Sequence, residues 1–209
     1  DATENTFTNV TDMSYMFYGC STLKQIDLSN FNTSNVKKMG SMFFYCRVLE
    51  NIDLRSFDTS KVEEMDCMFL SCSSLKDIDV SSFDTKNVKI FYRMFSGCEK
   101  LKTLSISNFD FVNATTISSM FENCKQLESI DFGKIGLQQT CNLRGMFKKC
   151  SQLVALDLSF IDYNKVSNVE SLLYNDTSLE TIIVSSNFKT DDADIFTGAT
   201  NLKKIILTD

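Results

Sequence analysis

The 209-residue chain contains no histidine, no tryptophan and no proline. Without histidine it lacks the commonest general base of enzymes and a common zinc ligand. No apolar run approaches the roughly 18 residues of a membrane-spanning helix, and no signal-peptide pattern opens the chain. These absences argue against an acid–base enzyme, a zinc site and direct insertion of this segment into a membrane.

Basic residues are not in excess either. The chain has 21 Lys and Arg against 27 Asp and Glu, a formal net charge of −6 and a pI near 4.8. A nucleic-acid partner needs clustered Lys and Arg that neutralise phosphates. The basic residues here are scattered among the acids, so we expect no nucleic-acid partner.

One stretch, MFYGCSTLKQIDLSNF at residues 16–31, is repeated along the chain. Its Met-Phe pairs recur every 26 residues, and a fixed period of this length is the signature of a solenoid. The clear copies are MFFYCRVLENIDLRSF (42–57), MFLSCSSLKDIDVSSF (68–83) and MFSGCEKLKTLSISNF (94–109), followed by the looser MFENCKQLESIDFGKI and MFKKCSQLVALDLSFI.

The last copies are less regular. A seventh keeps the register with Leu172 and Leu173, and an eighth, with Ile195 and Phe196, arrives three residues early. We expect residues 1–209 to form a single stacked array with atypical C-terminal repeats over 170–209. The opening DATENTF reads as a cut inside a repeat, so we expect the array to be a fragment of a longer chain.

Each repeat reads as a helix followed by a short strand. In residues 35–46 the apolar positions fall within an arc of roughly 120° at about 100° per residue, which predicts an amphipathic helix of about three turns. Thr33 or Ser34 would cap its start, and Gly97 suits the turn that ends the equivalent helix of a later copy. The apolar positions are Val36, Met39, Met42, Phe43 and Cys46.

In the strand that follows, Leu49, Ile52 and Leu54 are expected to point inward, while Asn51 and Asp53 point outward. The spacing is the leucine-rich-repeat strand pattern. The predicted fold is therefore an α/β solenoid: a leucine-rich-repeat-like right-handed array of about eight 26-residue helix-turn-strand repeats. Its parallel sheet would line the concave face and its helices the convex face.

Two columns of side chains follow from this stacking. Lys24, Glu50 and Lys76 would be neighbours from rung to rung, with alternating sign. Six of the eight cysteines share one repeat position, so no pairing is singled out, and we expect buried free thiols. The six are Cys20, Cys46, Cys72, Cys98, Cys124 and Cys150; Cys67 and Cys141 lie outside this column and are also expected to be unpaired.

The pattern MFxxCxxLxxIDLSxFDTSxVxxM resembles the bacterial-surface 26-residue repeat, a relative of the BspA-like leucine-rich-repeat proteins. The resemblance covers essentially the whole chain. It departs from the pattern where Asp176 and Ala199 replace the column cysteine. It implies a surface-exposed, secreted or lipoprotein location and adhesion to host proteins or neighbouring cells, and it brings no catalytic residues.

The outward strand positions are the candidate ligand-binding residues. Successive acids about 5 Å apart repel one another unless something compensates. One hypothesis is a cation, with calcium the candidate, or a basic ligand held along Asp27, Asp53 and Asp79. The alternative is that each Asp bonds a flanking hydroxyl such as that of Ser29 or Ser81 and stays hydrated. The column reads Asp27, Asp53, Asp79, Ser105, Asp131, Asp157, Ile183 and Ile206, with Asp77 alongside.

The switch to Ile183 and Ile206 has two interpretations. An exposed apolar patch marks a contact surface, and the terminal strand KKIILTD offers an open edge for self-association. Alternatively, the array continues or is capped beyond Asp209, and these residues are covered there. Four Asn-x-Ser/Thr sites, which matter only in a eukaryotic secretory route, occur at Asn9, Asn32, Asn113 and Asn175.

We therefore expect a non-enzymatic, extracellular or surface-displayed binding module. It would need no cofactor and would present its concave sheet to a protein or glycan on a host or neighbouring cell. The alternatives are a structural spacer or self-associating stalk, and an intracellular interaction scaffold.

Overall fold

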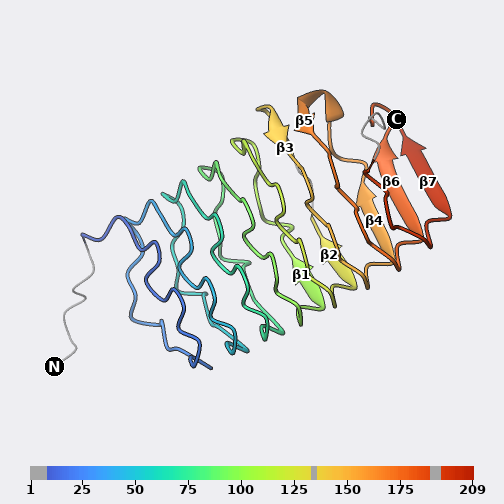
Figure 1. Ribbon diagram of the computed structural model, residues 1–209. Helices are drawn as coiled ribbons and strands as arrows, with labels where there is room; N and C mark the ends of the chain where they lie inside the picture. The colour runs from blue at the N-terminus through green and yellow to red at the C-terminus, as the bar shows by residue number, and fades with distance from the viewer. Residues whose placement is uncertain (1–8, 133–135, 189–193) are drawn as a thin grey trace.

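The computed structural model describes residues 9–132, 136–188 and 194–209. Successive copies of the repeat form coils that stack in chain order, from the blue N-terminal coil to the red C-terminal coil (Figure 1). The chain is a β-solenoid whose coils bond to one another through parallel backbone contacts. Within the described ranges, no helix has the length and apolar character to cross a bilayer.

The regular elements are short and lie in the C-terminal half. The strands form three parallel sheets with the orders β1-β2, β3-β5 and β4-β6-β7. Earlier coils are joined by a column of single parallel bridges from Asp12 through Lys38 and Glu64 to Asn142. The elements are β1 (Thr103–Ser105), β2 (Ser129–Asp131), β3 (Cys141–Asn142), β4 (Ala155–Leu158), η1 (Tyr163–Lys165), β5 (Val166–Asn168), β6 (Thr181–Ser185) and β7 (Lys204–Thr208).

The predicted α/β solenoid with helices on a convex face is wrong. The three-residue η1 is the single helical element of the described residues. In the segment expected to be a helix, alternate N–H groups leave their own coil: Phe43 donates to the carbonyl of Met68 at 2.9 Å. The N–H groups between them close four-residue β-turns instead, as Phe44 does to the carbonyl three residues back, that of Ser41, at 3.1 Å. An α-helix would have directed both to carbonyls four residues back.

Left-handed residues at four-residue intervals keep this segment from becoming a helix. Ser41 and Tyr45 have φ of 57° and 62°, and Gly97 continues the Tyr45 column with φ of 74°. Such residues are costly away from glycine and do not extend a helix. Thr33, the expected helix cap, instead donates its hydroxyl to the carbonyl of Asp58 at 3.0 Å and accepts that residue's N–H at 2.8 Å.

The predicted burial pattern is confirmed even though the element is not a helix. Val36, Met39, Met42, Phe43 and Cys46 are all fully buried. Consecutive four-residue β-turns also bring side chains three and four positions apart to the same side. Spacing alone therefore could not distinguish a stack of turns from a helix.

The predicted strand register is confirmed where strands form. Ser105 pairs with Asp131, Asp157 with Ile183, and Ile183 with Ile206. The inward positions of the second copy are buried as expected, with Leu49 and Leu54 fully covered and Ile52 8% exposed. The 26-residue repeat therefore sets the register in which neighbouring coils pair.

A column of phenylalanine rings runs through the core. Phe69 stacks on Phe43 at 5.5 Å between ring centres, and Phe95 stacks on Phe69 at 5.6 Å. The column continues to Phe121 at 5.8 Å. Offset stacked aromatic pairs add roughly 0.5–1.5 kcal/mol each beyond the burial of their area.

The cysteine column lies beside these rings, and its thiols are unpaired in the structure, as expected. From Cys46 onward each column thiol donates to a carbonyl of the preceding coil; Cys72 Sγ, for example, lies 3.1 Å from the carbonyl oxygen of Phe43. Cys20, in the first coil, is half-buried, so the prediction of a buried thiol is wrong there. Burial raises the pKa of the Cys124 thiol to about 12, so this group stays protonated and available as a donor. The column thus joins neighbouring coils by side chain as well as by backbone.

Asp176 takes the cysteine position in the seventh copy. Its side chain is fully buried, and its Oδ1 accepts the N–H of Cys150 at 2.7 Å. Its Oδ2 is buried without a hydrogen-bond partner in the described part of the chain. Burial raises the pKa of this carboxyl to about 8, because the ionised form has no compensating charge beside it.

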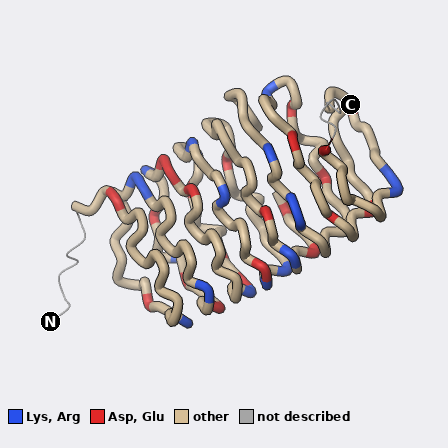
Figure 2. The backbone as a smooth tube through the Cα atoms, in the orientation of Figure 1, with Lys and Arg blue, Asp and Glu red and all other residues tan. Residues whose placement is uncertain are grey.

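Surface charges also follow the stacking. Lys76 Nζ lies 2.6 Å from Glu50 Oε2, and Lys102 Nζ lies 3.3 Å from Glu128 Oε1, as the charged column predicts. Figure 2 shows acidic and basic positions interspersed over the coils. These pairs are exposed, so they support the register and add little to stability.

Replacing one ring in the middle of the phenylalanine column tests how the core is held. Phe95→Ala is expected to lower the free energy of unfolding by about 3–5 kcal/mol, because it opens a cavity between two stacked rings. Tyr92→Ala, at a side chain that is 38% exposed, should cost about 0.5 kcal/mol or less. Urea titration followed by circular dichroism measures both; equal losses would contradict a continuous ring column.

The buried carboxyl of Asp176 predicts a pH dependence. The unfolded chain releases this proton near the ordinary Asp pKa of 3.8, whereas the folded chain keeps it up to about 8. The free energy of unfolding should therefore fall as pH rises from about 4 to about 8 and then level off. Asp176→Cys restores the residue of the other copies and should remove this fall.

Urea unfolding at several pH values, compared between the native chain and Asp176→Cys, isolates the effect from all other carboxylates. Asp176→Asn serves as a second variant of nearly the same shape. Parallel pH profiles for all three proteins would contradict the assignment.

Candidate ligand-binding site

Four aspartates form what we call the acidic strip: Asp27, Asp53, Asp77 and Asp79. Three of them occupy the outward position just before a buried residue of the strand column, for example Asp53 before Leu54. Inward and outward positions alternate along an extended chain. The apolar core therefore places these carboxylates on one face of successive coils.

The backbone around the strip fixes the direction of its carboxylates. Asp27 Oδ1 accepts the N–H of Ser29 at 2.9 Å, and Asp79 Oδ1 accepts the N–H of Ser81 at the same distance. The backbone bond from Ser29 lowers the pKa of Asp27, and side-chain and backbone bonds from Ser81 lower the pKa of Asp79. Both groups are ionised at neutral pH.

Asp53 has a stronger partner in Arg55. Arg55 Nε donates to Asp53 Oδ1 at 3.0 Å, and Nη2 donates to Oδ2 at 2.6 Å. The side-chain bond to this guanidinium lowers the pKa of Asp53 to about 2. The strip therefore carries four carboxylates and one guanidinium, and it presents net negative charge with a fork-shaped donor in its centre.

The strip borders two neighbouring hollows of about 490 and 370 Å³. Asp53 and Arg55 line both. The half-buried side chains of Ile26 and Ile78 supply apolar surface between the charges. The larger hollow is lined by Ile26, Asn51, Ile52, Asp53, Arg55, Asp77, Ile78 and Asp79, and the smaller by Ile26, Asp27, Leu28, Ser29, Asp53, Arg55 and Ser56.

The other acids of the predicted column lie further along the stack, in β2 and β4. Asp131 Oδ2 accepts the hydroxyl of Ser105 at 3.0 Å, and Asp157 Oδ1 accepts the N–H of Ser159 at 2.9 Å. Neither lines the two hollows. Of the predicted acidic residues, the structure thus brings together the four of the N-terminal half.

The apolar end of the column differs in detail from its prediction. Ile183 and Ile206 are half-buried in β6 and β7. Their inward-facing neighbours in the last strand are the more exposed residues, with Ile205 at 46% and Leu207 at 62%. The apolar surface at this end therefore comes from core positions of β7 that no further coil of the described chain covers.

The cation interpretation gains no support. Within the described ranges, no three or more carboxylate, thiol or imidazole side chains are grouped to hold a metal ion. Asp27 and Asp79 instead accept hydrogen bonds from their flanking serines, as the alternative interpretation predicts. The donors are the backbone N–H groups as well as the hydroxyls.

The four Asn-x-Ser/Thr sites differ in their surroundings. Asn9 is exposed, whereas Asn175 is half-buried and left-handed with φ of 61°. Asn113 donates its amide to the carbonyl of Lys86 at 2.7 Å. Asn32 Oδ1 accepts the hydroxyl of Ser34 at 2.7 Å. The side chain of Asn32 is therefore engaged in a local turn, and that of Asn113 in a bond to the preceding coil.

Sequence analysis missed Arg55, although a signal was present. It lies two residues after Asp53, so continuing the inward–outward alternation of the predicted strand by one step would place both side chains on one face. A third hollow, of about 560 Å³ and centred on Ser71 and Ser96, was also missed. The sequence feature that could have predicted this hollow is the change in side-chain size along one column of equivalent repeat positions.

Comparison with known proteins finds a family for the chain. The model of a family described as "Mycoplasma protein of unknown function, DUF285" matches residues 2–104, 50–154 and 91–208. These overlapping matches together extend over nearly the whole chain. No curated protein and no solved structure matches it.

The pairing in the strip predicts a measurable change in Asp53. Arg55→Ala should raise the pKa of Asp53 from about 2 toward its ordinary value of 3.8, because the guanidinium is the largest cause of the shift. Carboxyl-carbon NMR shifts followed through a pH titration report it. Arg144→Ala, which removes an arginine paired with Glu170, is the control; an unchanged Asp53 in Arg55→Ala would contradict the geometry.

Proposed function

The chain belongs to the DUF285 family, and from this premise we propose that it is a non-enzymatic binding module that recognises a protein partner through the acidic strip. Four carboxylates, one arginine and the half-buried side chains of Ile26 and Ile78 gather at two adjoining hollows, and this arrangement carries the proposal. A partner segment with basic side chains around a small apolar contact would complement it.

The energetics of interfaces support this choice of partner. Charge complementarity speeds encounter and sets specificity, while a central apolar contact supplies binding energy. Asp27 and Asp79 are held by their own backbone turns. They would therefore lose little conformational entropy on binding.

The lack of histidine and the protonated state of the buried column thiols support a non-enzymatic role. The resemblance of the repeat to BspA-like surface proteins supports an extracellular or surface-displayed location. It also supports adhesion to a host or neighbouring cell, with a protein or a glycan as the ligand. These finer assignments are part of the proposal.

A structural spacer or self-associating stalk is the second candidate. The exposed side chains of Ile205 and Leu207 in β7 would favour it where no further coil covers them, because an uncovered apolar strand edge pairs readily with another chain. An intracellular scaffold is the third, and the unpaired thiols favour it.

Neutralising the strip tests the binding role. Peptides selected from a random displayed library against the purified chain should be rich in Lys and Arg. The triple variant Asp27→Asn, Asp53→Asn, Asp79→Asn should bind them at least about tenfold more weakly, since each Asn keeps the shape and loses the charge. Fluorescence polarisation at two salt concentrations measures the affinity.

The matched control removes the same charge elsewhere, with Glu63→Gln, Glu170→Gln and Glu180→Gln, whose partners are Lys89, Arg144 and Lys203. It should bind as the native chain does. If no selected peptide binds, or if the strip variant and the control bind equally well, the spacer becomes the better account.

A further inference from the structure

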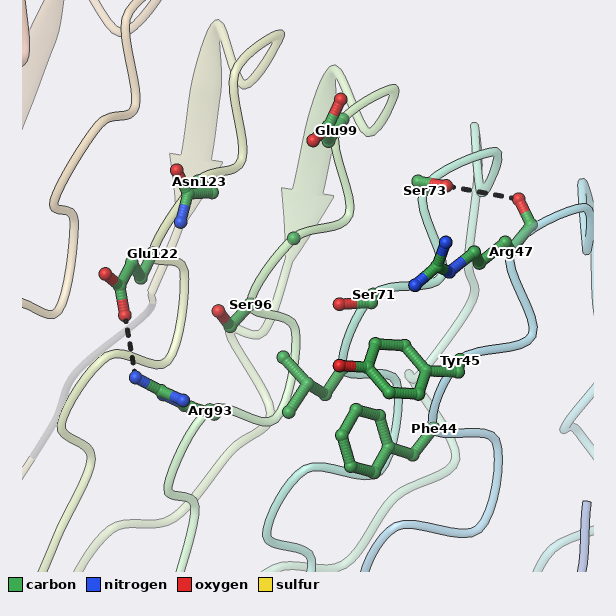
Figure 3. Close-up of a pocket in the computed structure, with 12 residues that line it drawn as sticks. Phe44, Tyr45, Arg47, Ser71, Ser73, Arg93, Ser96, Glu99, Glu122 and Asn123 are labelled. Carbon is green, nitrogen blue, oxygen red and sulfur yellow. Dashed lines mark hydrogen bonds and ion pairs between the residues drawn. The ribbon is translucent and has the colours of Figure 1, made fainter. Parts of the chain in front are cut away.

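The third hollow, of about 560 Å³, lies on the turn side of the coils, and we call it the notch. It arises because side chains shrink and then grow again along two columns of the repeat. Figure 3 shows Phe44, Tyr45 and Arg47 on one side, Arg93, Glu122 and Asn123 on the other, and Ser71 and Ser96 between them. The columns read Phe44, Leu70, Ser96, Glu122 and Tyr45, Ser71, Gly97, Asn123.

The left-handed backbone of the column that contains Ser71 and Gly97 also carries Tyr45 and Lys149, so it does not by itself require small residues; at Gly97 a side chain would in addition be crowded by Ser71. Gly97 has φ of 74°, and a side chain there would lie 3.3 Å from the Cα of Ser71. Ser71 itself has φ of 60°. The notch is about 560 Å³ in volume, within the range of small-ligand sites. At about 4.8 Å per coil, its walls are roughly 14 Å apart.

Some of the charged side chains around the notch form ion pairs and others do not. Glu99 pairs with Lys125 at 2.8 Å, and Glu122 lies 3.5 Å from the guanidinium of Arg93. Arg47 is exposed and has no ion pair among the described residues. Within the described ranges, the notch therefore has one cation, Arg47, without a carboxylate partner.

Arg47 is also held in position. Its guanidinium lies over the ring of Tyr45, 4.9 Å from the ring centre. A guanidinium held against an aromatic ring is a preorganised bidentate hydrogen-bond donor for a carboxylate. Tyr18, which is 50% exposed, extends the aromatic surface: its ring lies 5.2 Å from that of Phe44 and 6.1 Å from that of Tyr45.

The floor of the notch offers side-chain groups rather than backbone groups for hydrogen bonding. The N–H groups of Tyr45, Ser71, Gly97 and Asn123 all donate to carbonyls of the next coil. An extended peptide pairs through unoccupied backbone groups at a sheet edge, and the notch does not present such a row of donors. What remains are hydroxyl, amide and carboxylate groups.

From this geometry we propose that the notch binds a saccharide chain that carries a carboxylate. The carboxylate would meet Arg47, sugar rings would lie against Tyr18, Phe44 and Tyr45, and sugar hydroxyls would bond Ser71, Ser96 and Asn123. This site is separate from the acidic strip and extends the proposed function to a second ligand class. A sugar fits better than a peptide because its hydroxyls match the short polar side chains and because Leu70 is the one aliphatic residue of the lining.

Calorimetric titration of the purified chain with defined oligosaccharides tests the proposal. One arm uses a tetrasaccharide of alternating glucuronate and N-acetylglucosamine, and the other uses sialyl-lactose, so that two sources of the carboxylate are distinguished. The N-acetylglucosamine tetrasaccharide and lactose are the neutral controls, and an octaglutamate peptide represents the competing class. At least one acidic saccharide should bind about tenfold or more tightly than its neutral counterpart.

Three variants locate the binding. Arg47→Ala should weaken it about tenfold or more, and Arg47→Lys should weaken it less, because the charge remains without the fork. Ser73→Tyr should block the notch; other copies carry Arg47, Glu99 and Lys125 at this position, so the coil accepts a long side chain there. Arg144→Ala changes a residue that does not line the notch, and it should bind as the native chain does.

The proposal is overturned if no acidic saccharide binds, or if neutral and acidic forms bind equally. It is also overturned if Arg47→Ala binds normally. Binding of octaglutamate that depends on Arg47, without saccharide binding, would assign the notch to acidic peptides instead. Melting temperatures of the variants show that each one is folded, and the two Arg47 variants carry the test if Ser73→Tyr is not.

Discussion

The structure depends on backbone hydrogen bonds that leave one coil and end on the next. In the turn segment alternate N–H groups, such as those of Phe43 and Tyr45, donate to carbonyls 25 residues further along. This constraint puts equivalent residues of successive copies above one another. The phenylalanine rings then stack, the thiols reach the preceding coil, and opposite charges meet on the surface. The core is continuous because each coil is covered by its neighbours.

The same constraint explains where recognition can arise. When a column keeps one residue type, its surface is uniform; when the residue changes, the surface gains a hollow or a charge. The acidic strip forms where Asp27, Asp53 and Asp79 follow one another, and Arg55 interrupts the charge. The notch forms where Tyr45 gives way to Ser71 and Gly97. The notch is thus a local departure from the repeat, whereas the strip combines a column that keeps one residue type with one departure, Arg55.

The sequence predicted the period, the buried positions, the strand register and the gathering of Asp27, Asp53 and Asp79 on one face. All of these follow from repetition and from alternation of inward and outward residues. It did not predict the turn segment, because three- and four-residue spacing of apolar residues is shared by helices and by consecutive turns. Ser41 and Tyr45 adopt the left-handed conformation although neither is a glycine, so the sequence does not mark these turns. The notch escaped prediction because it depends on side-chain sizes compared across copies rather than within one.

The most direct test of this account is an NMR experiment that detects couplings across hydrogen bonds. The structure predicts a coupling between the amide nitrogen of Phe69 and the carbonyl carbon of Met94, whose oxygen lies 2.8 Å from that nitrogen. Equivalent couplings should link other copies in the same register. A coupling from Phe69 to the carbonyl carbon of Met65, four residues back, would show a helix in this segment and would contradict the stacked-turn architecture.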